Sequence, residues 1–287
     1  MNPMTPTEKR QKFRAVLAGS RLRSPATVFD ALSARIAESV GFDLGILSGS
    51  VCAATVIAAP DLAVHTLTEF ADQIRRITRF SSLSLFVDAD QGYGNALNVM
   101  RTVEELEHAG LSGLAIEDLV MPARFGSTAD ELISVEEMKG KLRAALAARR
   151  DPSLVIVART ASVKIDSLEN TVARAKAYAA TGVDAVFVTG MRKIEELDAI
   201  RAEVRIPIVL GTAPALKRQD VEARGVRFML QGHPPLAAVI KSLHDVYTHL
   251  HGGGSPADYK AHLATPEQME RVLGGDNYKK WQEAYLR

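Results

Sequence analysis

The sequence predicts an α/β fold, a (β/α)8 barrel of the TIM type followed by a C-terminal helical extension. Eight short apolar runs rich in β-branched residues alternate with longer amphipathic segments. Polar residues recur where these runs end, and in a barrel such ends share one face. The length of 287 residues also suits a barrel of ~250 residues with an added tail. A doubly wound open sheet is the competing arrangement.

The expected elements follow from the order of these segments. Strands are expected at residues 22–29, 44–48, 83–88, 114–117, 154–159, 185–189, 206–210 and 226–230. Helices are expected at 33–40, 96–109, 135–148, 168–180, 194–203 and 235–250. Glycines at 41, 110, 182 and 225 precede strands, where the C-terminal end of a helix favours a positive φ.

The barrel is expected to span residues 1–251 and the extension residues 252–287. The extension starts with the flexible sequence Gly-Gly-Gly-Ser-Pro at 252–256, continues with a helix at 266–273, and ends in an aromatic segment. Because the barrel is complete before it, we expect this part to pack on a neighbouring subunit or to be exchanged between subunits.

Composition argues against several classes of protein. The 35 basic and 34 acidic residues nearly cancel and form no dense basic stripe, which disfavours nucleic acid or a membrane as partner. No apolar stretch approaches the ~18 residues of a spanning helix. Cys52 is the only cysteine, which excludes a disulfide scaffold or a cysteine-based zinc site, and a cytoplasmic location is the default.

Acidic side chains follow several expected strands. Asp88 and Asp90 end the third, Glu117 and Asp118 end the fourth, and Asp61 lies in the loop after the second. An Asx turn or a helix cap explains an isolated pair of aspartates about equally well. Three separate loops that deliver acids to one rim are harder to explain by capping. Their oxygen ligands predict a Mg²⁺ site, with Mn²⁺ as an alternative.

Three other residues bear on chemistry. Arg159 ends the fifth strand, where its planar guanidinium suits a carboxylate, although it also balances the acidic rim. His233 follows the eighth strand and is a candidate for hydrogen bonding or proton transfer; alone, it would more often be structural. Cys52 has no adjacent base and is expected to be a small buried residue.

The segment Asp-Ala-Asp-Gln-Gly-Tyr-Gly-Asn at 88–95 resembles the D-x-D-x-G-Y-G-N signature of the isocitrate lyase/phosphoenolpyruvate mutase superfamily. Residues 29–35, 48–50, 116–118 and 157–160 resemble the same superfamily in the same order, so that the likeness covers roughly residues 8–250. It implies a modified barrel whose last helix is commonly exchanged between subunits of a homodimer or homotetramer, and the binding of Mg²⁺ and a small 2-keto acid.

The resemblance also implies a role for each matching residue. Asp88 would be the nearest metal ligand, while Asp61, Asp90 and Glu117 would act largely through water. Ser50 and the backbone of Gly49 and Ser50 would hold the substrate carboxylate, and Arg159 the keto oxygen. With Ser48 and His233, which are candidates by their positions at strand ends, the expected substrate-binding set is Ser48, Gly49, Ser50, Arg159 and His233. The expected catalytic set is Arg159, His233 and Asp61.

The loop after the fourth strand separates the branches of the superfamily. The lyases carry K-[KR]-C-G-H there, whereas residues 122–126 read Pro-Ala-Arg-Phe-Gly, which argues against cleavage of isocitrate. This segment and Gln-Gly-His at 231–233 resemble the oxaloacetate decarboxylase branch, but residues 211–214 lack the tyrosine that this branch can offer. The expected reaction is Mg²⁺-dependent decarboxylation of oxaloacetate, or of a close 2-keto acid, to pyruvate and CO2 through an enolate. Carbon–carbon or carbon–phosphorus cleavage of another 2-keto acid is the alternative, and a non-catalytic keto-acid binding protein is a third possibility.

Overall fold

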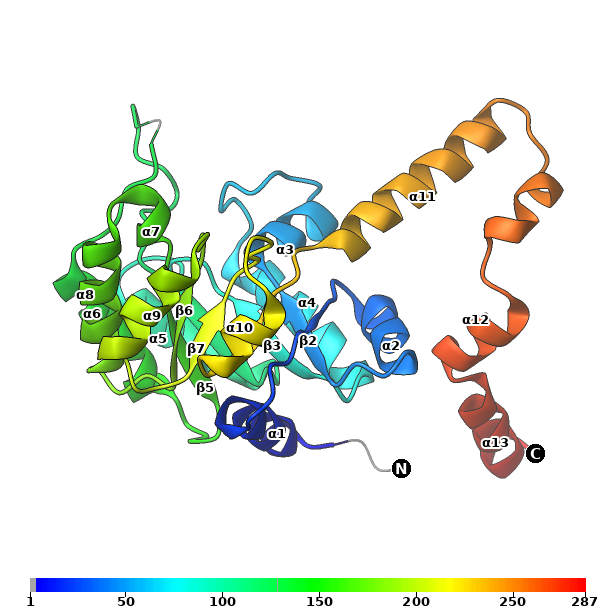
Figure 1. The fold of residues 1–287 in the computed structure, drawn as a ribbon. Coiled ribbons are helices and arrows are strands. Elements are labelled where there is room, and N and C mark those ends of the chain that lie inside the picture. Colours follow the sequence, from blue (N-terminus) through cyan, green and yellow to red (C-terminus); the bar gives the residue numbers. More distant parts are fainter. Residues whose placement is uncertain (1–3, 128) are drawn as a thin grey trace.

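The computed structural model describes residues 4–127 and 129–287. Eight parallel strands form one sheet in the order β1 to β8, and helices surround it (Figure 1). The strands are β1 (Ala26–Thr27), β2 (Leu44–Leu47), β3 (Ser84–Asp88), β4 (Gly113–Glu117), β5 (Val155–Thr160), β6 (Ala185–Val188), β7 (Ile208–Leu210) and β8 (Val226–Met229). The predicted (β/α)8 barrel is confirmed, because every strand lies within one residue of its expected run.

The first and last strands meet through the segment before β1. The backbone amide of Arg23 donates to the carbonyl of Arg227 at 2.9 Å, and the amide of Met229 donates to the carbonyl of Arg23 at 3.0 Å. Arg23 and Phe228 thus form an isolated parallel bridge. This contact brings residues near the start of the chain beside residues that follow β8.

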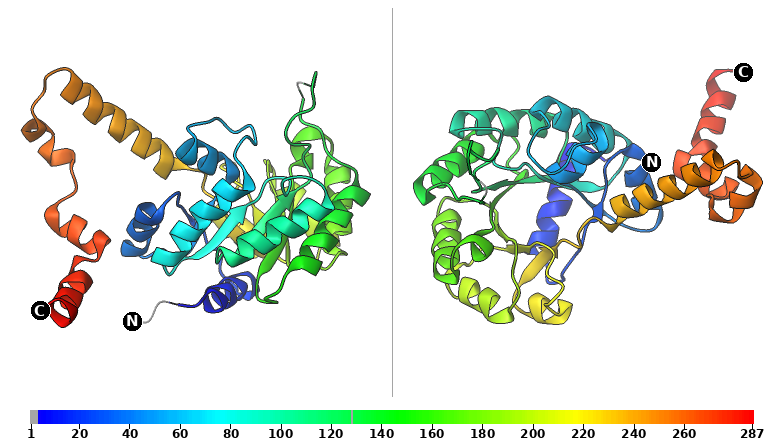
Figure 2. Two further views of the ribbon diagram at one scale, coloured as in Figure 1. Left: turned by 180° about the vertical axis from the view of Figure 1, so that it is seen from behind. Right: turned by 90° about the horizontal axis from the view of Figure 1, so that it is seen from above.

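Phe13 fills the lower end of the barrel. It comes from α1 (Pro6–Ala18), which Figure 2 shows across the interior of the ring when the barrel is seen from above. The Phe13 ring lies 5.6 Å from that of Phe86 and 5.2 Å from that of Phe228, and its side chain is fully buried. This apolar plug closes one end of the barrel, so that a ligand can enter only at the carboxyl ends of the strands.

The outer ring consists of α2 (Ala31–Ser39), α4 (Leu67–Phe80), α5 (Ala96–His108), α6 (Val135–Ala148), α8 (Leu168–Ala179), α9 (Ile194–Glu203) and α10 (Arg218–Ala223). The glycines expected after helices adopt positive φ, for example 98° at Gly41 and 90° at Gly110. Helices α1, α4 and α10 were not among the expected elements.

Helix α11 (Pro234–His251) forms where a helix was expected, but it projects away from the barrel (Figure 1), and none of its residues is buried. The chain then returns through a 3-10 turn (Pro256–His262), α12 (Pro266–Leu273) and α13 (Gly275–Tyr285). Helix α12 reaches α2, where Arg35 donates to the carbonyls of Val272 and Leu273 at 3.3 and 3.0 Å. None of the helices built from the described residues is long and apolar enough to cross a membrane.

Candidate active site

A cavity of about 630 Å³ opens at the carboxyl ends of the strands. The expected site residues that line it are Ser48, Ser50, Asp61, Asp88, Asp90, Glu117, Arg159 and His233. The remaining one, Gly49, lies between the two lining serines. Residues separated by up to 185 positions in the sequence therefore meet in one cavity, as the barrel geometry predicts.

Arg159 lies between two of the carboxylates. Its Nη1 is ion-paired with Asp88 Oδ2 and lies 3.2 Å from Glu117 Oε2. Its guanidinium also stacks over Phe187, 5.4 Å from the ring centroid. Burial alone would lower the pKa of Arg159, but the two carboxylates raise it above its ordinary value. Arg159 therefore stays cationic.

The buried carboxylates of the site are incompletely neutralised by Arg159. Burial raises the pKa of Asp90, and the nearby charges of Asp88 and Glu117 raise it further. Burial likewise raises the pKa of Glu117, against the opposing effect of Arg159. The single positive charge of Arg159 thus balances a group of carboxylates that repel one another.

Asp88 supplies a specific reason to place a cation here. Its Oδ1 is buried and has no hydrogen-bond partner among the described residues, although a buried carboxylate oxygen is costly when unpaired. No three acidic or histidine side chains of the described chain already converge at direct-ligand spacing. An all-oxygen set held largely through water fits Mg²⁺, which keeps several waters in protein sites.

Asp61 differs from the other acids. It lines the cavity from the loop between α3 (Gly49–Val56) and α4, and it is exposed. It forms no hydrogen bond or ion pair with any residue in the described ranges. The structure thus places it at the mouth of the cavity rather than in the buried group.

The 48–50 segment starts a helix, α3, which was not among the expected elements. Ser48 is its N-cap and accepts from the amide of Val51 at 3.3 Å. The amides of Gly49 and Ser50 have no acceptor in the described part of the chain, so they are free to bind an anion. A Cβ on Gly49 would lie 2.3 Å from Asp90 Oδ1, which explains why glycine is needed at this position.

His233 is hydrogen-bonded within the protein through both ring nitrogens. Thr27 Oγ1 donates its only proton to the carbonyl of Gly232 at 2.9 Å, so the 3.0 Å contact between Thr27 Oγ1 and His233 Nδ1 requires a proton on Nδ1. In the neutral ring, Nε2 then accepts from Ser48 Oγ at 3.2 Å. Burial lowers the pKa of His233, which favours this neutral form. Ser48 Oγ also lies 2.9 Å from Ser50 Oγ.

Asp118 lies behind the cavity and holds two strand ends together. Its Oδ2 accepts from Thr160 Oγ1 at 2.9 Å, from Tyr178 OH at 2.7 Å and from Arg174 Nη1 at 3.1 Å. Arg174 also donates to the carbonyl of Ile133 at 3.0 Å. These bonds hold Asp118 and Thr160, the residues next to Glu117 and Arg159, in place. They also anchor the C-terminal end of the loop that follows β4.

Sequence reasoning missed several residues of the site. Thr27, which contacts His233, and Phe187, which lines the cavity, lie near the ends of expected strands, a position that signals an active-site role in a barrel. Lys164, in the short helix α7 (Ser162–Ile165), also lines the cavity. Cys52 is fully buried, as expected, and burial raises the pKa of its thiol to about 12.

Comparison with known proteins adds independent information. Residues 13–251 match the phosphoenolpyruvate phosphomutase family. Oxaloacetate decarboxylase of Bradyrhizobium diazoefficiens is 50% identical over 267 residues, 92% of each chain, and that of Bradyrhizobium sp. is 46% identical over 285 residues, 99% of each chain.

Two solved structures have the same architecture. Phosphonopyruvate hydrolase in complex with oxalate and Mg²⁺ superposes with a TM-score of 0.88 at 28% identity, covering 99% of this chain and 100% of that one. Oxaloacetate acetylhydrolase with the inhibitor 3,3-difluorooxalacetate superposes with a TM-score of 0.84 at 26% identity, covering 98% of each chain.

Proposed function

We propose that this chain, which belongs to the phosphoenolpyruvate phosphomutase family, decarboxylates oxaloacetate, or a close 2-keto acid, to pyruvate and CO2. The observation that carries the proposal is the cavity in which incompletely neutralised carboxylates, Arg159 and the free amides of α3 face one space. The proposal is supported by relatives up to 50% identical over nearly the whole chain that carry the name oxaloacetate decarboxylase.

We propose Mg²⁺ as the cofactor, with Mn²⁺ as a substitute. Asp88 would be its nearest ligand, through the Oδ1 that lacks a partner, and Asp90, Glu117 and Asp61 would act largely through water. When bound, the cation would act as a Lewis acid towards the keto oxygen. The solved phosphonopyruvate hydrolase complex with oxalate and Mg²⁺ supports this choice.

The chain's own groups would bind and orient the substrate. The amides of Gly49 and Ser50 would hold the C1 carboxylate at the start of α3, and the Ser50 hydroxyl, whose proton points to Ser48 Oγ in this structure, would turn to donate to it. His233 would act through Ser48, because its Nε2 accepts the Ser48 proton and so fixes the direction of that hydroxyl. A binding face that is fixed in advance avoids reorganisation during the reaction.

Arg159 would stabilise the charge that develops in the transition state. The electron pair of the C3–C4 bond moves into the C2–C3 enolate as CO2 leaves, so negative charge grows on the C2 oxygen. A fixed guanidinium beside that oxygen lowers the barrier because it is already oriented. The enolate then takes its proton at C3 from water.

The test mixes purified protein with Mg²⁺ and oxaloacetate and follows pyruvate by a coupled assay, with the metal-only rate subtracted. We expect turnover that falls by several powers of ten in Asp88→Ala and persists in Asp72→Asn, a matched control on the exposed surface of α4. Absence of turnover in the wild-type protein, or near-native turnover in Asp88→Ala, would overturn the proposal.

A second candidate reaction is carbon–carbon or carbon–phosphorus cleavage of another 2-keto acid. The observation in its favour is the close superposition on phosphonopyruvate hydrolase and oxaloacetate acetylhydrolase. Product analysis with phosphonopyruvate and oxaloacetate separates the two, since hydrolytic cleavage of oxaloacetate releases oxalate and acetate, whereas decarboxylation releases pyruvate.

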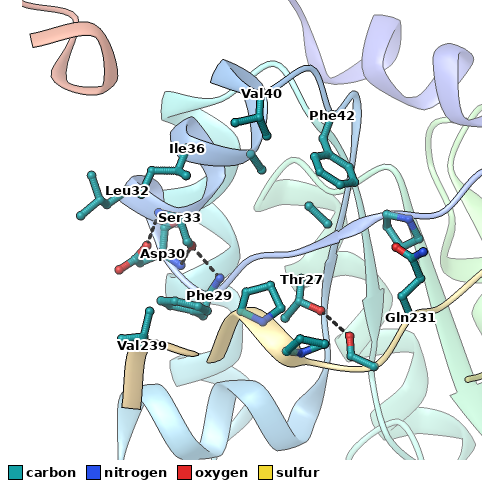
Figure 3. A pocket seen from close by; sticks show the side chains of 16 residues that line it. Thr27, Phe29, Asp30, Leu32, Ser33, Ile36, Val40, Phe42, Gln231 and Val239 are labelled. Atoms are coloured by element: carbon teal, nitrogen blue, oxygen red, sulfur yellow. Dashed lines mark hydrogen bonds between the residues drawn. The ribbon is translucent and has the colours of Figure 1, made fainter. Parts of the chain in front are cut away.

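We also propose a homodimer or homotetramer in which α11 is exchanged between subunits. An apolar groove of about 520 Å³ lies between α2 and the start of α11 (Figure 3). Its exposed apolar side chains include Leu32, Ile36 and Val40. Helix α11 carries a second exposed apolar face, which includes Ile240 and Leu243. Beyond its first turns, the helix projects away from the groove of its own copy.

We assign the groove to helix α11 of a second copy, because each copy offers both halves of the contact, and α12 of the same C-terminal segment already packs on α2, one wall of the groove. Light scattering after gel filtration should show an oligomer that Leu243→Asp dissociates and Ser242→Asp, on the other face of α11, leaves intact. A wild-type monomer would overturn the proposal. The division at residue 251 and the cytoplasmic location stay predictions.

A further inference from the structure

Lys164 reaches the candidate active site from a part of the fold that the proposed chemistry does not yet use. It lies in α7, directly after β5, and lines the cavity together with Ala161 and Ile165. Figure 1 shows α7 at the carboxyl end of the strands, above β6. The carboxylates Asp88 and Glu117 lie on β3 and β4 instead.

The Lys164 stem has a defined path. A Cβ built on Gly190 would lie 2.3 Å from Lys164 Cγ, 2.7 Å from Cδ and 2.4 Å from Cε. The methylene groups of Lys164 therefore lie directly against the backbone of Gly190. They occupy the space that a side chain at position 190 would need. Gly190 follows β6, also lines the cavity, and has a φ of 89°, which glycine adopts at least cost.

The Lys164 ammonium is available for a ligand. The side chain is exposed, and it pairs with no acidic residue within residues 4–127 and 129–287. By contrast, Arg159, the other basic residue lining the cavity, is held by Asp88 and Glu117. The cavity wall also includes the uncharged residues Phe187, Thr189 and Thr212.

We propose that Lys164 binds the second carboxylate of a dicarboxylic 2-keto acid and so selects a four-carbon dianion over a monocarboxylate. This inference rests on the proposed function, which places the C1 carboxylate at α3 and the keto oxygen at Arg159. A substrate held there extends towards the β5–β7 side of the cavity, where Lys164 provides a positive charge. An ammonium on a flexible stem suits a carboxylate whose orientation changes during the reaction.

The charge flow predicts how Lys164 affects the kinetics. As the C3–C4 bond breaks, the C4 carboxylate loses its charge and leaves as neutral CO2. Its attraction to the ammonium is therefore present in the ground state and is lost towards the transition state. An interaction of this kind lowers KM and does not raise kcat.

The test compares Lys164→Met, which keeps an unbranched stem over Gly190, with Lys193→Met, an exposed lysine at the start of α9 that does not line the cavity. We expect Lys164→Met to raise the KM for oxaloacetate about tenfold, the usual size of one partly exposed charge-assisted contact, with kcat unchanged or higher. Lys193→Met should leave both constants unchanged, and Lys164→Arg should restore most of the affinity.

Binding measurements separate this inference from the proposed function. Dissociation constants are measured by calorimetry in Mg²⁺ for oxalate, which has no carboxylate to reach Lys164, and for 3,3-difluorooxaloacetate, which has one. We expect Lys164→Met to weaken only the second ligand, again about tenfold. Equal effects on both ligands, or no effect on either, would overturn the role of Lys164 even if oxaloacetate is decarboxylated. A selective effect without any turnover would uphold the second-carboxylate site and overturn only the decarboxylation.

Discussion

Asp90→Asn should stabilise the metal-free protein while weakening its response to Mg²⁺. Asp90 is 5% exposed, and the structure gives its carboxylate no hydrogen bond or ion pair stronger than a 4.0 Å contact with His65. Burial lowers the pKa of His65, so it supplies little positive charge. The aspartate charge therefore faces Asp88 and Glu117 without a cation of its own.

The size of the effect follows from two opposing contributions. Two like charges ~6 Å apart repel by ~3 kcal/mol at an effective dielectric constant of ~20. Asp90 packs against the first turn of α3 at Gly49. The favourable interaction of its negative charge with this helix N-terminus offsets about 1 kcal/mol of the repulsion. The repulsion exceeds the helix contribution. Removal of the Asp90 charge should therefore raise the unfolding free energy by about 2 kcal/mol, or Tm by about 4–8 °C.

The effect must grow with pH. The pKa of Asp90 is raised in the folded protein, so the folded state holds a proton more tightly than the unfolded chain, whose aspartates titrate near ~3.9. Stability is thus lost as the pH rises above that value and through the folded pKa. Asparagine lacks this titration, so the advantage of Asp90→Asn should be small at pH 5 and largest at pH 8.5.

Thermal unfolding in EDTA and in Mg²⁺, at both pH values, provides the assay. In Mg²⁺ the wild-type protein should gain more stability than Asp90→Asn, because a ligand that binds only the folded state stabilises it by an amount that rises with the logarithm of its affinity. Asp61→Asn, on the exposed loop, should change Tm little in EDTA. If Asp90→Asn were less stable than wild type in EDTA at pH 8.5, the fold would stabilise this charge and the argument for a repulsive acidic group would fail.

Three further substitutions test other parts of the structure. Arg159→Met should lower kcat for pyruvate formation by about 10²–10³, the usual cost of one oriented donor in the transition state; a loss below threefold would remove Arg159 from the reaction. Gly49→Ala should abolish the Mg²⁺-dependent rise in Tm, because the alanine Cβ would lie 2.3 Å from Asp90 Oδ1 and displace that carboxylate. An unchanged rise would show that Mg²⁺ binding does not need the Asp90 carboxylate at its present position. Phe13→Ala, at the plugged end of the barrel, should lower the unfolding free energy in urea by about 3–5 kcal/mol; a loss under 1 kcal/mol would mean that this plug is dispensable.

The strands could be predicted because each is a buried apolar run whose polar end faces the cavity. The start of α3 was harder to recognise, since Ser-Gly-Ser at 48–50 has the composition of a turn. Helix α4 has a clear N-terminal signal, the capping box of Thr66 and Glu69. This signal follows an irregular loop and could have been found in the sequence.

Long-range contacts explain most of what the sequence could not show. The neutral tautomer of His233 depends on Thr27, which reaches it only because the start and the end of the barrel meet. The apolar face of α11 predicts a helix, but amphipathic periodicity is the same whether that face packs on its own barrel or on a second copy. Lys164 had no sequence signal, because its position depends on the bare backbone at Gly190.

The charges of the cavity also determine how its ligands depend on one another. Five carboxylates line it, those of Asp61, Asp88, Asp90, Glu117 and Asp130, against the two cations Arg159 and Lys164, so a dianion such as oxalate meets net repulsion unless a divalent cation is present. We therefore expect calorimetry to detect oxalate binding in Mg²⁺ and none in EDTA. By reciprocity, oxalate must tighten Mg²⁺ binding by the same factor. Equal oxalate affinity in EDTA would instead show that Arg159 and the free amides of α3 suffice, and that the acidic group does not serve to hold a cation for the substrate.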